Sequence, residues 1–443
     1  MRKCSLKILC TVILAAMLLL QCACFDTHSS YKPSSPTYAP VSPSPAATPE
    51  PFVVYNHSSD DLIDTEAILE TAKKAMEQPS LKLSDYDDAF CSYLFNRVYL
   101  SRYCKTDDLK RVAVDMYISL LTSQESYKLP DSISLTAEEM KLMFSYILAD
   151  CPELMNPKNS YTIYTYEDTK RTDRIEFKYM VTPDEYYSML SETFAIIEGI
   201  IAQADGQSAF SHELIAYNNL IQICTYVKEG DNVATAYGAL CEGEALCEGY
   251  SDAFTLMMLC MGFKSTQVCG TAINSSTSES EPHAWNIVCI DDSFYYTDPT
   301  WDDYKSDNMR GSTYSYMNID AATIAKTHVI DETYIVDDMP ACDDQKYNYH
   351  SFYGLVIPQG EDINAIMFKF IDDAIESRTD GGASLLFKCE SESDFNSILD
   401  KFSDIAGDWN SKRDYDFYIS SIRYSYDMRM LTARYELYLS SVN

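Results

Sequence analysis

Apolar and polar positions follow two different periods along the chain, so the sequence predicts helices and strands together. Between residues 134 and 227, several segments carry apolar residues every three to four positions behind a capping residue, which is typical of helices. These expected helices are 134–148, a run that begins at Thr182, and 212–227. Alternating segments rich in Thr and Tyr predict strands at 161–166 and 174–181. The pattern therefore predicts an N-terminal α/β region, mainly helical, over residues 56–204.

The C-terminal region, residues 345–443, shows the same two periods. Helices are expected at 363–375 and 393–405, and strands at 384–388, 417–426 and 430–439. Nothing in this region has the spacing of catalytic residues, so we interpret it as a structural or ligand-contacting α/β appendage. The fold class that the sequence predicts is α+β.

A short β-hairpin is expected between these two regions. Asp291 and Asp292 form a plausible two-residue turn, and the segments on either side read as strands. Continuing the pairing away from the turn places Trp285 opposite Asp298. Side chains alternate along a strand, so His283, Trp285 and Asp298 are expected on one face of the hairpin.

The first 24 residues predict an export signal, because a basic start precedes an apolar run too short to span a membrane comfortably. Leu20 to Cys24 resembles a bacterial lipoprotein cleavage site with Cys24 as the lipidated residue. Gln21 departs from that pattern, and Cys22 is a rival processing site. Residues 25–55 are rich in Ser, Pro and Thr, which predicts a disordered linker. We expect an exported protein, either lipid-anchored at the cell surface or secreted.

The net charge and the cysteine content limit the ligands and the cysteine sites that the sequence predicts. The formal net charge of -33 argues against nucleic acid, because phosphate binding needs a basic face. Eleven cysteines follow Cys24, the odd number that one reserved thiol plus an even, paired set would give. They include no C-x-x-C pair, so neither a zinc ribbon nor a thioredoxin-type site is predicted, and we expect no metal.

Cys247, His283 and Asp298 supply the three residue types of a cysteine-nucleophile enzyme. The apolar positions after Cys247 have helical spacing and end at Gly262, so the thiol is expected at a helix N-terminus, where the dipole and a nearby imidazolium favour a thiolate. Asp298 can bind one ring nitrogen of His283 and leave the other for the thiol. Cys241 is the rival nucleophile, since the same Cys-Glu-Gly sequence begins there, but only Cys247 is followed directly by the long apolar run.

These blocks resemble the core of the transglutaminase-like superfamily, which has a papain-like fold. The chain shows C-E-G-Y-S-D-A-F from Cys247, H-A-W-N from His283 and D-P-T-W from Asp298, in the order of the family. The similarity covers residues 205–330, which are expected to form the catalytic domain. It implies a helix that bears the cysteine, packed on an antiparallel sheet that bears the histidine and the aspartate, with the three residues as a catalytic triad.

The resemblance implies acyl transfer through a thioester on Cys247, followed by transfer to water or to an amine. The superfamily contains crosslinking transglutaminases, peptidases and a deglycosylating amidase, so hydrolysis and transamidation both stay open. For an exported chain we favour hydrolysis of a protein or peptide substrate at the cell envelope. No cofactor is required. The backbone N–H of Cys247 is one candidate oxyanion donor and Tyr237 a second, while Trp285 is a candidate wall of the substrate groove.

The competing hypothesis is a non-catalytic surface module that binds peptide or glycan in the same groove. The abundance of tyrosine, 35 residues, suits a binding surface. An inactive descendant would, however, be free to lose the triad, and this chain retains all three residue types. Reactivity of Cys247 toward a thiol probe separates the two hypotheses.

Overall fold

The computed structural model describes residues 93–441 with three gaps, at 274–278, 304–311 and 379–381. The expected signal segment with Cys22 and Cys24, the linker over 25–55 and the start of the N-terminal region lie outside the described residues. The described residues contain both helices and strands, in agreement with the predicted α+β class. No helix among them is long and apolar enough to cross a membrane.

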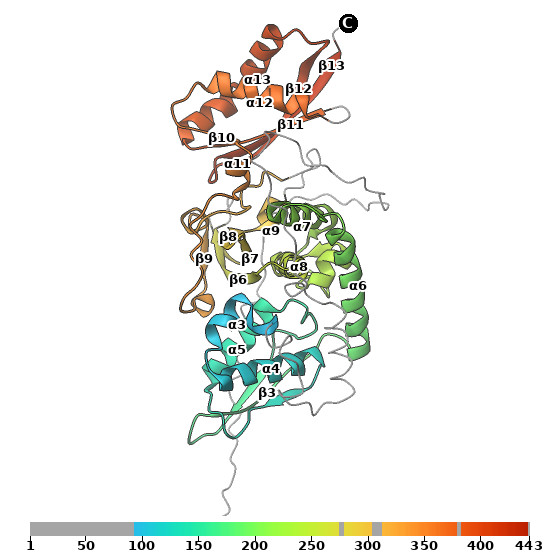
Figure 1. The fold of residues 1–443 in the computed structure, drawn as a ribbon, viewed down its shortest axis with the longest axis vertical. Helices are drawn as coiled ribbons and strands as arrows, with labels where there is room; N and C mark the ends of the chain where they lie inside the picture. The colour runs from blue at the N-terminus through green and yellow to red at the C-terminus, as the bar shows by residue number, and fades with distance from the viewer. Residues whose placement is uncertain (1–92, 274–278, 304–311, 379–381, 442–443) are drawn as a thin grey trace, which may run out of the picture. The chain divides into compact units, whose positions relative to one another are not determined.

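The described chain forms two compact units, each considered by itself below (Figure 1). Unit 1 comprises residues 93–300 and 328–342, and unit 2 comprises residues 301–327 and 343–441. The chain therefore leaves unit 1 after Thr300 and returns to it at His328.

Unit 1 is built from helices and three sheets, with strand orders β1-β3-β2, β4-β5 and β8-β7-β6-β9. Its elements are α3 (Val98–Tyr103), α4 (Asp107–Leu121), β1 (Ser126–Lys128), α5 (Ala137–Asp150), β2 (Thr162–Thr165), β3 (Thr172–Glu176), α6 (Pro183–Ile201), α7 (Ala209–Ile223), β4 (Thr225–Tyr226), the π-helix η2 (Gly238–Glu242), β5 (Glu244–Ala245), α8 (Cys247–Cys260), β6 (Ser265–Ile273), β7 (Ser280–Ile290), β8 (Ser293–Thr297), β9 (His328–Ile330) and the 3-10 helix η3 (Glu332–Tyr334). A further short helix, α9 (Pro299–Asp302), spans the point where the chain leaves this unit.

Two helices of unit 1 start where the capping residues predicted them. Thr136 and Glu139 form a reciprocal capping box at the start of α5, and Thr182 and Glu185 form another at the start of α6. The predicted strand over 174–181 is wrong in its second half, because β3 ends at Glu176.

The polar loop side chain of Asn156 explains the early end of that strand. Its carbonyl oxygen accepts hydrogen bonds from the N–H groups of Met180 at 3.1 Å and Val181 at 3.0 Å. These backbone groups are therefore satisfied by a loop rather than by a neighbouring strand.

Buried carboxylates join the N-terminal helices to the central sheet of unit 1. Asp150, the last residue of α5, accepts hydrogen bonds from the N–H groups of Tyr99 and Leu100 at the start of α3, each at 2.8 Å. Its other oxygen accepts one from the Thr266 hydroxyl on β6 at 2.7 Å. Glu153, also fully buried, lies 3.8 Å from the Arg97 guanidinium, so both carboxylates have a role in packing.

The central sheet, β8-β7-β6-β9, is antiparallel and packs against α8 (Figure 1). The Asn286 side chain on β7 donates to the Ser251 carbonyl at 2.9 Å and to the Thr255 hydroxyl at 2.8 Å, both on α8. The predicted hairpin is confirmed, since Ile290 pairs with Ser293. Both turn residues have left-handed backbones, with φ of 48° and 64°, as a two-residue turn of this hand requires.

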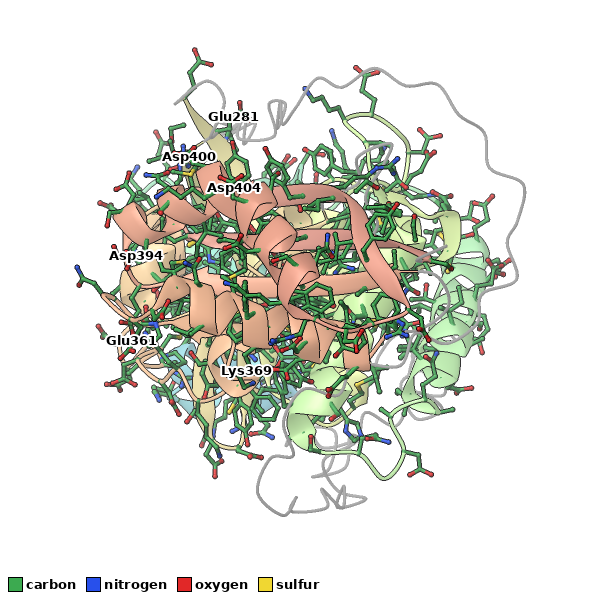
Figure 2. The ribbon with its side chains drawn as sticks, turned by 90° about the horizontal axis from the view of Figure 1, so that it is seen from above. Glu281, Glu361, Lys369, Asp394, Asp400 and Asp404 are labelled. Carbon is green, nitrogen blue, oxygen red and sulfur yellow. The ribbon has the colours of Figure 1, made fainter. Side chains whose placement is uncertain are left out.

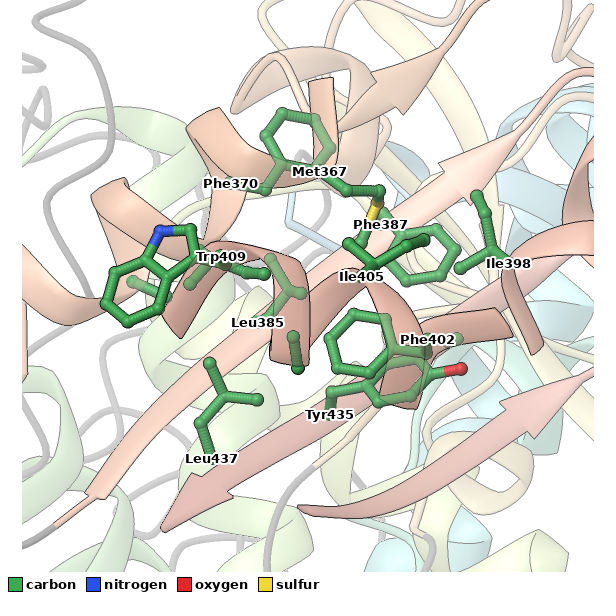
Figure 3. Packing of buried hydrophobic residues seen from close by; sticks show 14 of the residues in the cluster. Met367, Phe370, Leu385, Phe387, Ile398, Phe402, Ile405, Trp409, Tyr435 and Leu437 are labelled. Carbon is green, nitrogen blue, oxygen red and sulfur yellow. The ribbon is translucent and has the colours of Figure 1, made fainter. Parts of the chain in front are cut away.

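Unit 2 contains one four-stranded sheet of order β10-β11-β13-β12. Its elements are α10 (Ala321–Ile324), α11 (Tyr349–Phe352), β10 (Val356–Ile357), α12 (Ile363–Glu376), β11 (Gly382–Cys389), α13 (Glu392–Lys412), β12 (Phe417–Asp427) and β13 (Thr432–Ser441). The predicted helices and strands of this region are therefore confirmed. Alternate residues of β11 and β13 form a core with α12 and α13, shown in Figure 3, in which Phe402 stacks on Tyr435 with ring centroids 3.9 Å apart.

Helix α13 has an apolar face toward this core and an acidic face that carries Asp400 and Asp404 (Figure 2). It extends seven residues beyond the predicted end at 405, to Lys412. Trp409 explains the extension, because its ring is fully buried and its Nε1–H donates to Asp372 of α12 at 2.8 Å. Gly407 does not end the helix, because it does not adopt the left-handed backbone of a helix-ending glycine.

Candidate active site

Cys247 is the first residue of α8, and it is 3 % exposed. The turn before the helix is held by a hydrogen bond from the N–H of Leu246 to the carbonyl of Val233, at 2.8 Å. Glycine is required at position 249, because a Cβ there would lie 2.4 Å from the same carbonyl oxygen. The prediction of a cysteine at a helix N-terminus is confirmed, and the helix dipole favours a negative charge at this place.

His283 and Asp298 lie within hydrogen-bond distance of each other, as the register of the hairpin predicts. His283 is on β7 and Asp298 directly follows β8, and the imidazole Nε2 lies 2.7 Å from the carboxylate Oδ2. Both side chains are buried. The other carboxylate oxygen accepts a hydrogen bond from the N–H of Thr300 at 3.0 Å, which fixes the orientation of the carboxylate.

His283 and Asp298 each shift the pKa of the other. Burial alone would lower the pKa of His283, but the Asp298 charge, the hydrogen bond with that carboxylate and a hydrogen bond with the Cys247 thiol raise it to about 10. Burial would conversely raise the pKa of Asp298, and the neighbouring histidines instead hold it well below its usual value. Since Nε2 of His283 binds Asp298, Nδ1 is the ring nitrogen that remains to meet the thiol.

A second histidine, which the sequence analysis did not identify, binds the same carboxylate oxygen. Nε2 of His328 lies 3.2 Å from Oδ2 of Asp298, and its side chain is as buried as that of His283. His328 opens the three-residue strand β9, at the point where the chain re-enters unit 1. A strand of three residues gives little periodic signal. The closeness of His328 to Asp298 is therefore visible only in the structure, where the chain returns to unit 1.

Trp285 and Tyr237, the two predicted groove residues, occupy different surroundings. Trp285 is fully buried and packs beside both imidazoles, with its ring centroid 6.1 Å from that of His283 and 4.8 Å from that of His328. Tyr237 is half-buried just before η2, and its hydroxyl donates to Glu192 of α6 at 3.0 Å. That interaction raises the pKa of Tyr237, after the larger effect of burial, to about 12.

The rival thiol Cys241 lies in η2, where its Sγ is 3.6 Å from the Thr193 hydroxyl of α6. Burial raises the pKa of Cys241, which keeps this thiol protonated. All ten cysteines of the described residues are free of disulfide bonds, so the paired set that the cysteine parity suggested is not found among them.

Two carboxyl groups on α8 were also not identified from the sequence. Burial raises the pKa of Glu248, the residue after the thiol, to about 7. Burial and the charge of Glu248 raise the pKa of Asp252, one turn further along, and the Asp252 carboxylate accepts a hydrogen bond from Gln267 of β6 at 2.8 Å. A Glu–Asp pair at this spacing is common on solvated helices, so the sequence alone gave no reason to single it out.

His283, Asp298 and His328 are also residue types that bind metals, and their nitrogen and oxygen atoms lie within 4.8 Å of one another. Ligand atoms around a zinc ion with bonds of about 2.0–2.2 Å lie roughly 3.3 Å apart. The 2.7 Å separation between His283 and Asp298 is shorter and is that of a hydrogen bond. The contact between His283 and Asp298 is therefore a hydrogen bond, while the 3.2 Å between His328 and Asp298 fits either kind of site.

A cysteine at a helix N-terminus beside a buried His–Asp pair is an arrangement that nucleophilic thiols use. Comparison with known proteins agrees, since residues 198–299, which include all three side chains, match the model of the transglutaminase-like superfamily. That match suggests acyl-transfer or cysteine-hydrolase chemistry.

One solved structure, described as the crystal structure of a TGase, is similar to the chain at 12 % identity and a TM-score of 0.24. The similarity covers 52 % of this chain and 58 % of that one, so the chain spans little more than half of its neighbour. A TM-score this low adds nothing to the structural argument. No curated protein matches the chain.

Proposed function

We propose that unit 1 is a cysteine acyl-transfer enzyme in which Cys247 is the nucleophile, His283 the general acid and base, and Asp298 the residue that orients the imidazole. One observation carries the proposal: His283 and Asp298 are buried and form a hydrogen bond of 2.7 Å. The same imidazole also forms a hydrogen bond with the Cys247 thiol at the start of α8. The packing of α8 on the antiparallel β6–β7 pair supports a papain-like core, and the match over 198–299 supports the same chemistry.

The proposed reaction proceeds through a thioester. The Cys247 thiolate forms a bond to the carbonyl carbon of a peptide or carboxamide, and the π-electron pair moves to the oxygen. The C–N bond then breaks, and the leaving amine takes the proton of the His283 imidazolium. Water or a primary amine next attacks the thioester and gives its proton to His283, and the thiolate leaves. Asp298 stabilises the imidazolium throughout.

The oxyanion of this reaction needs hydrogen-bond donors beside the thiol. The N–H of Cys247 belongs to the first turn of α8, whose N–H groups have no acceptor within the helix, and we propose it as the first donor. Tyr237 can serve as a second donor only by releasing Glu192 when substrate binds. Trp285, with no exposed surface, supports the imidazoles from inside rather than contacting bulk solvent.

The expected export signal places the substrate at the cell envelope, and there we favour a protein or peptide substrate that is hydrolysed. Transfer to an amine uses the same residues, so the acceptor must be determined by experiment. Attachment to a membrane would be through the lipid on Cys24.

The test is an assay that detects either acceptor. The full-length protein is incubated with a mixture of Gln- and Lys-containing proteins and a labelled primary amine, followed by intact-mass analysis. Incorporation that depends on Cys247 identifies transamidation, while cleavage or ammonia release that depends on Cys247 identifies a hydrolase.

Cys247→Ala and Cys241→Ala are the matched variants for this assay. The proposal expects Cys247→Ala to abolish the reaction and Cys241→Ala to retain it. Equal activity in the wild type and in Cys247→Ala would contradict the proposal. Complete inactivity, together with a Cys247 thiol that no alkylating probe labels, would favour a non-catalytic binding module.

A further inference from the structure

The Asp298 carboxylate binds two imidazoles through a single oxygen. Oδ2 lies 2.7 Å from Nε2 of His283 and 3.2 Å from Nε2 of His328, and all three side chains are buried. An ionised carboxylate can only accept hydrogen bonds, so His328 donates its Nε2–H. A catalytic pair needs only one histidine, and the second one therefore requires an explanation.

Residues of β6 and β7 determine the position of this second histidine. On β9, His328 pairs with Ala272 of β6, and its ring meets the Trp285 indole edge-to-face at 4.8 Å. Gly270 lets the strands approach, because a Cβ there would lie 2.1 Å from the Val329 carbonyl oxygen and 2.9 Å from the Trp285 ring. The close approach of β9, and with it the position of His328, thus depends on a glycine at this position.

We propose that His328 is a positioning residue that holds the Asp298 carboxylate against His283 and moderates its charge. The proposal rests on the proposed function, because it assigns His328 a task within that site. It goes beyond the three residues of the triad by making the carboxylate a shared acceptor between two histidines.

The physical reason is charge compensation. Asp298 has no exposed surface, and a buried carboxylate must receive its stabilisation from donors. Three donors converge on it: His283, His328 and the N–H of Thr300. Without His328 the carboxylate would carry more unbalanced charge, and it would attract the His283 proton more strongly.

The neighbouring groups with the largest effects on the titration of His283 are Asp298 and the Cys247 thiol, and those with the largest effects on Asp298 are the two histidines. On the neighbouring strand β6, the residue opposite His328 is Ala272, which does not titrate. Because Oδ2 of Asp298 contacts both imidazoles, the carboxylate is the group through which a substitution of His328 reaches His283.

The experiment follows the ring signals of ¹³C-labelled histidines by NMR as a function of pH in the full-length protein. The chain has six histidines, and His283→Gln assigns the signal of interest. The variants compared are His328→Leu, which removes the donor, and His328→Gln, which keeps an N–H donor without a titrating ring. His212→Gln, on α7, is the control for labelling and handling.

We expect His328→Leu to raise the pH midpoint of His283 by about half a pH unit or more, and His328→Gln to restore the wild-type midpoint. We also expect Cys247 in His328→Leu to keep its fast alkylation to a higher pH, by about the same half unit, and to return to the wild-type profile in His328→Gln.

An unchanged His283 midpoint in a folded His328→Leu protein would overturn the inference. Equal changes in the Leu and Gln variants would also overturn it, because they would indicate a role in packing alone. Failure of the proposed function has a different signature: the His283 midpoint still depends on His328, but Cys247 of the wild type reacts no faster than Cys241.

Discussion

The two four-stranded sheets of the described residues both bury apolar side chains, but the sheet of unit 1 also buries a group of ionisable ones. In unit 2 the helix-covered face of β10-β11-β13-β12 buries rings and aliphatic groups such as Phe387, Phe402 and Tyr435. In unit 1 the sheet β8-β7-β6-β9 buries His283 and His328, with Asp298 at the end of β8. Burying an ionisable group costs several kcal/mol unless it is paired, whereas burying apolar surface stabilises the fold.

Buried ionisable groups that are paired mark the part of the molecule where chemistry is expected. The described core of unit 2 consists mainly of aliphatic and aromatic side chains, and packing accounts for their positions. In unit 1, the burial of charged groups costs free energy, and hydrogen bonds to the Asp298 carboxylate offset that cost. Perturbed titration combined with such geometry is typical of an active site.

The largest effect is expected from removing the carboxylate charge of Asp298, directly after β8. Asp298→Asn keeps the shape but cannot stabilise the imidazolium, so turnover in the acyl-transfer assay should fall about 10³-fold or more. The control is Asp292→Asn in the exposed turn of the same hairpin, which should retain turnover. Substantial activity in Asp298→Asn would show that the carboxylate has a packing role only.

The apolar sheet should respond in stability instead. Phe402→Ala removes a ring that is 2 % exposed and stacked on Tyr435, so we expect a loss of about 3–5 kcal/mol in the free energy of unfolding of unit 2, measured by urea denaturation. Lys401→Ala, the exposed neighbour on the same helix, should change it by less than about 0.5 kcal/mol. A similar loss in both variants would contradict the assigned core.

Unit 2 also contains one buried histidine, His350, and its burial should make the stability of this unit depend on pH. Burial, aided by the charge of Lys388, lowers the pKa of His350 to about 3. The unfolded chain gains this proton below about pH 6.5 and the folded chain does not, so His350 makes unit 2 less stable as the pH falls from about 6.5 toward 3. His350→Leu should reduce the stability lost between pH 7.5 and 4.5 by about 2 kcal/mol. The same loss in wild type and variant would mean that His350 takes up its proton in the folded state.

The smallest effect is expected from removing metal ions. The proposed reaction has no step that uses a metal, and the His283–Asp298 distance is that of a hydrogen bond. Dialysis against EDTA should therefore leave turnover unchanged. Activity that disappears on dialysis and returns with added zinc would require a different assignment of His283, Asp298 and His328.

The parts of this site that the sequence predicts are those specified locally. Asp291 and Asp292 determine the register of their hairpin, and the register brings His283 to Asp298. The helix that starts at Cys247 follows from a continuous apolar run. His328 is different, because it reaches the site through a three-residue strand after the chain has passed through unit 2.

Two further features that the sequence did not predict also depend on contacts between distant segments. The contacts of Asp150 with Tyr99 and Thr266 join segments far apart in the sequence, so neither partner can be inferred from local pattern. The extension of α13 to Trp409 depends on a buried ring and its bond to Asp372. In both cases tertiary contacts outweigh local propensity.

Whether Cys247 is an activated nucleophile is measured by the pH dependence of its alkylation. The full-length protein is treated with limiting iodoacetamide from pH 5 to 11, and each cysteine is followed by peptide mapping. We expect Cys247 to react about tenfold or more faster than Cys241 at pH 7, and to lose its advantage above about pH 10, where His283 releases its proton. In His283→Gln, Cys247 should lose its rate advantage at pH 7, because the imidazolium that stabilises its thiolate is gone. If Cys247 reacts no faster than Cys241, or if His283→Gln leaves its profile unchanged, Cys247 is not an activated nucleophile and the proposed function is wrong.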